Sequence, residues 1–168
     1  VMRPNGTQDW EETFENCLAA ISIMHDAVAT GNVKAVALDG VDKLLEGSST
    51  VLRESLVNMN QDFVKIQKDT TKLTVKALDW KIRNDIYDMV LNPILLMDCD
   101  RYIITHEKPV YDGIGVPVPI GTVPDWYKTT PHKLLQMVRL TKVRRGINTV
   151  YVATLEACKT NPSAVGKT

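Results

Sequence analysis

The sequence predicts a mainly α-helical fold, a bundle built on one long amphipathic helix, followed by a small α+β part after a Pro/Gly-rich connector. Apolar residues recur every seven positions through residues 50–91, which contain no glycine or proline. Aromatic residues make up only 6% of a chain that is 44% apolar, so aliphatic side chains and methionine must fill the core. Prolines and glycines gather instead between positions 109 and 124.

These patterns divide the 168 residues into four segments of one compact domain. Residues 1–8 are expected to form a flexible arm, and residues 9–98 a helical bundle and oligomerisation region. Residues 99–127 hold a strand and the connector, and residues 128–168 a basic helix–strand part.

The first helix is predicted to follow Asp9, which can cap it, with Glu12 at the capping-box spacing. Gly31-Asn32 is a plausible stop. A second helical piece is predicted over residues 33–47, weakened by Gly40. A break at residues 47–49 is favoured over a helix that passes through them.

The long helix is predicted to run over residues 50–91 and to stop at Asn92-Pro93, because proline disfavours helix at the residue before it. Its length would be roughly 60 Å, about twice the diameter of a domain of this size. Such a helix must project or pack along an equally long partner. Its stripe is therefore the expected oligomer interface, made of Leu45, Leu52, Leu56, Met59, Phe63, Ile66, Leu73 and Trp80.

Charges beside the stripe favour an antiparallel pairing of two copies. In that orientation Asp62 meets Arg83 and Asp69 meets Lys76, whereas a parallel pair sets lysines against each other. A homo-oligomeric bundle is the favoured interpretation; a bundle within one chain and an isolated coiled coil are the alternatives.

After the long helix, residues 101–105 are predicted to form a short strand and residues 106–127 an extended, anchored loop. Thr130, Pro131 and Gly146 have the positions of a helix cap, a first helical residue and a terminator. A strand is predicted for residues 147–155, with helix as a close alternative.

The formal net charge of zero conceals a gradient: residues 1–62 carry −6, residues 63–126 carry −1 and residues 127–168 carry +7. The basic end predicts a surface for an anionic partner, which could be a nucleic-acid backbone, an anionic lipid or an acidic protein. If it is a nucleic-acid surface, its arginines should share one open face. The acidic third of another copy is a built-in candidate and would give head-to-tail contacts. The residues expected to bind are Lys128, Lys133, Arg139, Lys142, Arg144 and Arg145.

No motif of an enzyme, metal site or cofactor site stands out, so we expect none. Cys17, Cys99 and Cys158 lack metal-finger spacing, which favours inert thiols in a reducing compartment or a virion. A metal or thiol site around Asp98, Cys99, Asp100 and His106 is a minor alternative. No apolar run reaches the roughly 18 residues of a membrane helix.

The expected function is therefore that of a non-enzymatic, self-assembling structural or scaffold protein, similar in design to a viral coat, matrix or nucleocapsid protein. The alternatives are an oligomeric nucleic-acid-binding module and a polymerase cofactor. All of these are analogies of design.

Overall fold

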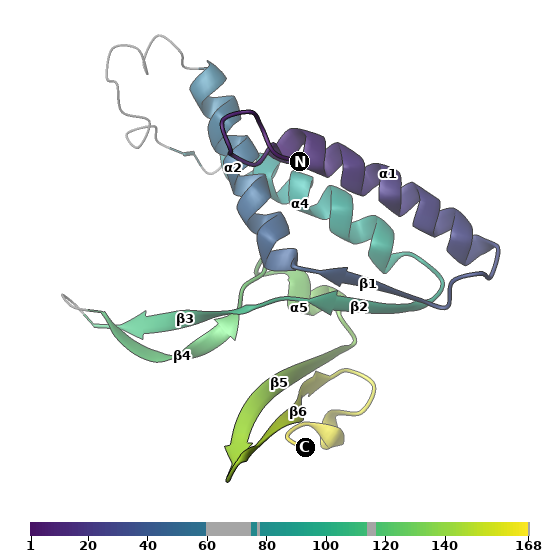
Figure 1. Cartoon of the computed structure of the whole chain (residues 1–168), viewed down its shortest axis with the longest axis vertical. Helices are drawn as coiled ribbons and strands as arrows, with labels where there is room; N and C mark the ends of the chain where they lie inside the picture. Colours follow the sequence, from purple (N-terminus) through teal and green to yellow (C-terminus); the bar gives the residue numbers. More distant parts are fainter. Residues whose placement is uncertain (60–74, 77, 114–116, 168) are drawn as a thin grey trace. The chain divides into compact units, whose positions relative to one another are not determined.

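The computed structural model describes residues 1–59, 75–76, 78–113 and 117–167. The chain separates into two compact units, Val1–Trp126 (unit 1) and Tyr127–Thr168 (unit 2). The described residues form helices and three two-stranded sheets, an α+β structure (Figure 1). The prediction of a mainly helical bundle built on one long helix is therefore wrong.

The elements of each unit follow one another along the chain. Unit 1 holds α1 (Trp10–Ala29), β1 (Ala35–Asp39), α2 (Val41–Met59), α4 (Asp79–Leu95), β2 (Asp100–Ile104), β3 (Glu107–Asp112) and β4 (Val118–Pro124). Unit 2 holds α5 (Thr130–Lys133), β5 (Gln136–Arg145), β6 (Asn148–Cys158) and the 3₁₀ turn Pro162–Ala164.

The first helix has the predicted start and end. The backbone N–H of Glu12 donates to Asp9 Oδ1 at 3.1 Å, and this bond, together with one from Arg3, lowers the pKa of Asp9. Gly31 ends the helical region with a φ of 75°, which glycine adopts without strain.

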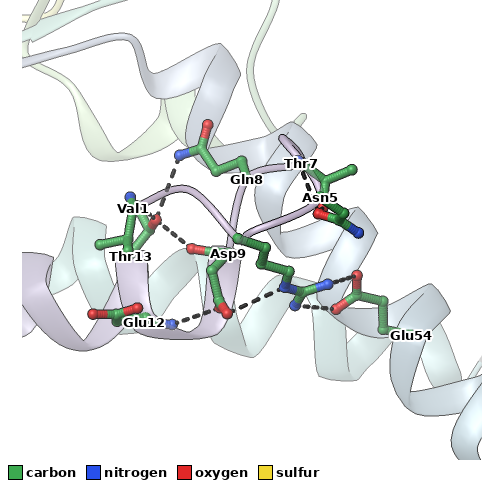
Figure 2. Close-up of polar contacts among 9 residues, drawn as sticks. Val1, Asn5, Thr7, Gln8, Asp9, Glu12, Thr13 and Glu54 are labelled. Carbon is green, nitrogen blue, oxygen red and sulfur yellow. Dashed lines mark hydrogen bonds and ion pairs between the residues drawn. The ribbon is translucent and has the colours of Figure 1, made fainter.

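Residues 1–8 make more contacts than a flexible arm would. Arg3 donates to both carboxylate oxygens of Glu54 in α2, at 2.7 and 3.0 Å, and its Nε lies 3.1 Å from Asp9 Oδ2. Its backbone N–H also donates to Thr7 O at 2.7 Å. Figure 2 shows this network, in which Asp9 and Glu54 anchor the segment to the start of α1 and to α2.

The helix predicted over residues 33–47 is wrong in its first half. Residues 35–39 form β1, which pairs in parallel with β2 from Ala35↔Asp100 to Asp39↔Ile104. Gly40, with a φ of 84°, separates β1 from α2. Val36 and Leu38 on the covered side alternate with exposed residues, the period of two that is typical of a strand.

The predicted break at residues 47–49 is also wrong, because α2 runs through it. The hydroxyls of Ser48 and Ser49 donate to the carbonyls of Leu44 and Leu45, at 2.8 and 2.9 Å, instead of capping a new helix. Gly47 lies against the ring of Trp10 in α1. A Cβ atom at position 47 would come within 2.3 Å of Trp10 Cε3, so only glycine allows this approach.

A continuous helix over residues 50–91 is ruled out, because residues 75–76 and 78 are not helical and α4 begins at Asp79. The sequence predicted that the helix stops at Asn92-Pro93, but α4 continues through these residues to Leu95. Pro93 cannot donate a backbone hydrogen bond. Extending the helix nevertheless buries Ile94 on the same face as Tyr87, Val90 and Leu91, all at most 1% exposed, and this burial offsets the lost bond.

The β-structure was only partly predicted. The strand predicted at residues 101–105 is confirmed as β2. The connector predicted as a loop instead contains an antiparallel hairpin, β3–β4, with a bulge between Val110 and Tyr111. Its prolines are tolerated because both strands of a two-stranded sheet are edge strands.

The helix predicted from Thr130 to Gly146 is confirmed only at Thr130–Lys133. Residues 136–145 form β5, which pairs with β6 and so confirms the strand predicted after Gly146. Gly146 and Ile147 make a two-residue turn between Arg145 and Asn148. Gly146 has a φ of 62°, so it serves the first central position of a hairpin turn and does not end a helix.

Gly47→Ala is expected to lower the free energy of unfolding by about 1–3 kcal/mol, because the added methyl group forces the Trp10 ring or α1 to shift. Chemical denaturation would measure this change. Gly121→Ala is the matched control, since a Cβ there meets nothing within 4 Å. Equal stability of the two variants would contradict the close contact of α1 with α2.

Candidate binding surface

Charge is divided between the two units. Unit 1 carries nineteen acids and twelve bases, a net charge of −7, whereas unit 2 carries one acid and eight bases, a net charge of +7. The boundary of the basic segment in the sequence is thus also the boundary between the units. Opposite fields of this size favour contacts between the unit of one sign and a surface of the other.

The β5–β6 hairpin has two different faces, because opposed residues of an antiparallel pair share a face. Val143, Val150 and Val152 lie on one face and are half-buried. The other face is open: Leu140 and Tyr151 are each 73% exposed. We call the exposed residues of this second face the apolar-basic face: Val138, Leu140, Lys142, Arg144, Thr149, Tyr151 and Ala153.

The cations predicted to bind a partner do not share one face. Lys142 and Arg144 lie on the apolar-basic face, while Arg139 and Arg145 lie on the opposite face of the hairpin. They also lie on a strand, so the helix dipole does not explain their presence. Lys128 is exposed ahead of the hairpin, and Lys133 is half-buried in α5.

The one acid of unit 2 is already paired. Glu156 Oε1 lies 3.0 Å from Arg139 Nε, with both side chains about a third exposed, so the pair contributes under about 1 kcal/mol. Arg144 Nε donates to the carbonyl of Gly146 in the turn at 3.2 Å. No acid of unit 2 remains to neutralise Lys142, Arg144 or Arg145, and an anionic partner could do so.

Unit 1 has an open surface that the sequence did not predict. On the β1–β2 pair, Val36, Leu38 and Ile103 point to the covered side, and α1, α2 and α4 lie on one side of the pair (Figure 1). The alternate residues are all exposed. We call them the outer sheet face: Ala35, Ala37, Asp39, Asp100, Tyr102 and Ile104.

The predicted heptad interface is divided among different environments. Leu52 is 1% exposed and belongs to the core of unit 1, and Leu45 and Leu56 are half-buried. Met59 is 73% exposed and Trp80 41%. The Trp80 ring is covered by the guanidinium of Arg83, whose Cζ lies 4.7 Å from the ring centroid. Three members, Phe63, Ile66 and Leu73, lie outside the described residues, as do Asp62 and Asp69.

The residues of the alternative metal site are separated by strand β2. Asp100 begins that strand and His106 follows its end, so at about 3.3 Å per residue they lie well over 10 Å apart. In the part of the chain that the structure describes, no three His, Cys, Asp or Glu side chains come together as metal ligands would.

His106 instead contacts Asp42 in the first turn of α2. Its Nδ1 lies 3.2 Å from both carboxylate oxygens, and its backbone N–H donates to Oδ1 at 3.3 Å. Burial of the Asp42 carboxyl would raise its pKa, but the hydrogen bonds from His106 outweigh this effect and lower it. The pair fixes the start of the β3–β4 hairpin against α2.

Comparison of the chain with protein-family models, with curated proteins and with solved structures finds no match. None of the helices in the described ranges combines the length and the hydrophobicity needed to span a bilayer.

Asp42→Asn should make the free energy of unfolding depend less on pH in the acidic range. Because the pKa of Asp42 is lowered in the folded state, the unfolded chain binds the proton first as the pH falls. The stabilisation by Asp42 is therefore present above the ordinary aspartate pKa of about 4 and is lost below it, as the pH falls through the lowered pKa of the folded state. The variant should be about 1–3 kcal/mol less stable at neutral pH, and the difference should shrink at low pH. Denaturation at several pH values measures this. The exposed Asp98→Asn is the control; an equal effect of both substitutions would contradict the role of Asp42.

Proposed function

We propose that this chain is a non-enzymatic, self-assembling structural protein whose copies associate through their oppositely charged units. The observation that carries the proposal is the coincidence of the charge boundary with the boundary between the units, at −7 and +7. A head-to-tail contact between unlike ends repeats from copy to copy and gives rings or filaments. A role like that of a coat or matrix protein fits such assembly.

Two further features support assembly. Exposed apolar side chains, such as Leu140 and Tyr151 in unit 2 and Tyr102 and Ile104 in unit 1, occur on strands beside charged residues. In addition, each sheet of the described residues has only two strands. Two-stranded sheets are of marginal stability alone and gain from packing against another surface.

Mass in solution should rise with protein concentration in steps of 18.8 kDa, and fall when salt is raised from about 50 to about 500 mM, because salt screens the attraction between the units. Light scattering on a sizing column measures both effects. A monomer at every protein concentration and salt concentration would exclude self-assembly.

A second candidate function is binding of a nucleic-acid backbone. It is favoured by Lys142, Arg144 and Arg145, which lie near the turn of a two-stranded ribbon, an element that fits a groove of duplex nucleic acid. Exposed Tyr151 lies directly opposite Lys142.

If this second candidate is right, Arg144→Glu with Arg145→Glu should abolish binding of a duplex oligonucleotide, and the logarithm of the wild-type affinity should fall linearly with the logarithm of salt concentration. Fluorescence anisotropy measures both. Glu11→Lys with Glu15→Lys is a control, because these exposed acids of α1 lie on the other unit. Binding that survives the arginine reversal would exclude the hairpin as the nucleic-acid site.

A further inference from the structure

We infer that the outer sheet face of one copy is the docking site for the apolar-basic face of the β5–β6 hairpin of a second copy. This inference rests on the proposed self-assembly and specifies its two surfaces. The outer sheet face is that of Asp39, Asp100, Tyr102 and Ile104, and the hairpin face is that of Leu140, Lys142, Arg144 and Tyr151.

The outer sheet face belongs to a parallel pair of strands. Parallel strands occur almost only in sheets that are covered on both faces. In β1–β2 the helices lie on one side only, while Tyr102 is 57% exposed and Ile104 46% exposed on the other. An aromatic and a branched aliphatic side chain at adjacent positions of one face are the composition of a buried surface, so this face is suited to be covered.

The two surfaces carry charges of opposite sign. The outer sheet face places Asp39 and Asp100 at opposite ends of the pair, with the apolar residues between them. On the hairpin, Lys142 and Arg144 follow the apolar Val138 and Leu140 along the same face. Both surfaces thus combine apolar side chains with charge of one sign, and the signs are opposite. A second copy supplies the basic surface without any other partner.

The contact between the two surfaces is small. Only six or seven side chains on each surface would take part. The contact should therefore bury less area than the roughly 1,200 Å² at the lower end of standard interfaces, and it should be transient. Two flat, two-stranded faces can pack about 10 Å apart, as sheets do in sandwiches. Assembly should then need high protein concentration, and charge should control it strongly.

The test reverses the charges on each surface. Lys142→Glu with Arg144→Glu, and separately Asp39→Lys with Asp100→Lys, should each weaken self-association about a hundredfold, because like charges then face each other. All four substitutions in one chain should restore it. So should mixing the two double variants, since each supplies the other's complement. Sedimentation velocity measures mass, and circular dichroism checks that each variant is folded.

The control is Glu11→Lys with Glu15→Lys, at exposed positions of α1. It changes the net charge by as much as Asp39→Lys with Asp100→Lys, the sheet variant. It should associate more strongly than the sheet variant. If wild type associates and both double variants associate equally well, the inference is overturned while self-assembly stands. If wild type is a monomer throughout, the proposed function fails as well. Association only in the presence of nucleic acid, seen as excess absorbance at 260 nm, would also overturn a direct contact between copies.

Discussion

The close approach of the Trp10 ring to the backbone at Gly47 is the constraint on which the rest of unit 1 depends. Because position 47 has no side chain, α1 can lie directly against α2. The same approach brings the start of α1 near Glu54, where Arg3 and Asp9 connect the N-terminal segment to both helices. Leu52 and the buried face of α4 then complete the core.

The β-structure of both units is distributed in pairs of strands. The β1–β2 pair is held by its covered face and by Arg101, whose guanidinium donates to the carbonyls of Leu95 and Met97 at the end of α4. The β3–β4 hairpin is fixed at its base, where His106 contacts Asp42 and Lys108 contacts Asp125 at 2.7 Å. In unit 2, the segment after β6 folds back onto that strand, since the backbone N–H of Gly166 donates to the carbonyl of Leu155. Folding thus covers one face of β1–β2 and leaves the other face of that pair open.

The sequence was informative where local signals agreed. At α1 the Asp9 cap, the apolar stripe and Gly31 all indicated one helix, and the structure has it. At residues 130–146 a cap, a proline and a terminal glycine also indicated a helix, but the β-branched and alternating residues of β5 and β6 prevailed, because Gly146 allows them to pair as a hairpin. The heptad spacing failed differently: α2 buries Leu52 of the stripe, but Trp80 in α4 is 41% exposed, and the residues that α4 buries, such as Val90 and Ile94, lie outside the stripe.

The candidate surfaces were predictable to a similar degree. Counting charges located Lys142 and Arg144, because net charge needs no fold to be read. Arg139 and Arg145 lie on the opposite face from these two residues, and this division could not be found while the segment was taken as a helix, in which neighbours are three or four residues apart. The outer sheet face had no signal of its own. It exists only because β1 pairs with β2, and a single sequence does not show such long-range pairing.

That pairing also sets the order in which the chain can fold. Ala35 pairs with Asp100, so β1 must wait until a partner 65 positions later in the chain is available. Closing so long a loop has a high entropic cost, and contacts of this kind slow folding. During synthesis, the helices and the N-terminal turn can form first, while β1 remains an unpaired edge until β2 has left the ribosome. Of the two strand pairs in unit 1, the pair that closes the longer loop is thus the one that creates the uncovered face, so a chain that has not yet paired β1 with β2 does not have that face to offer to a neighbour.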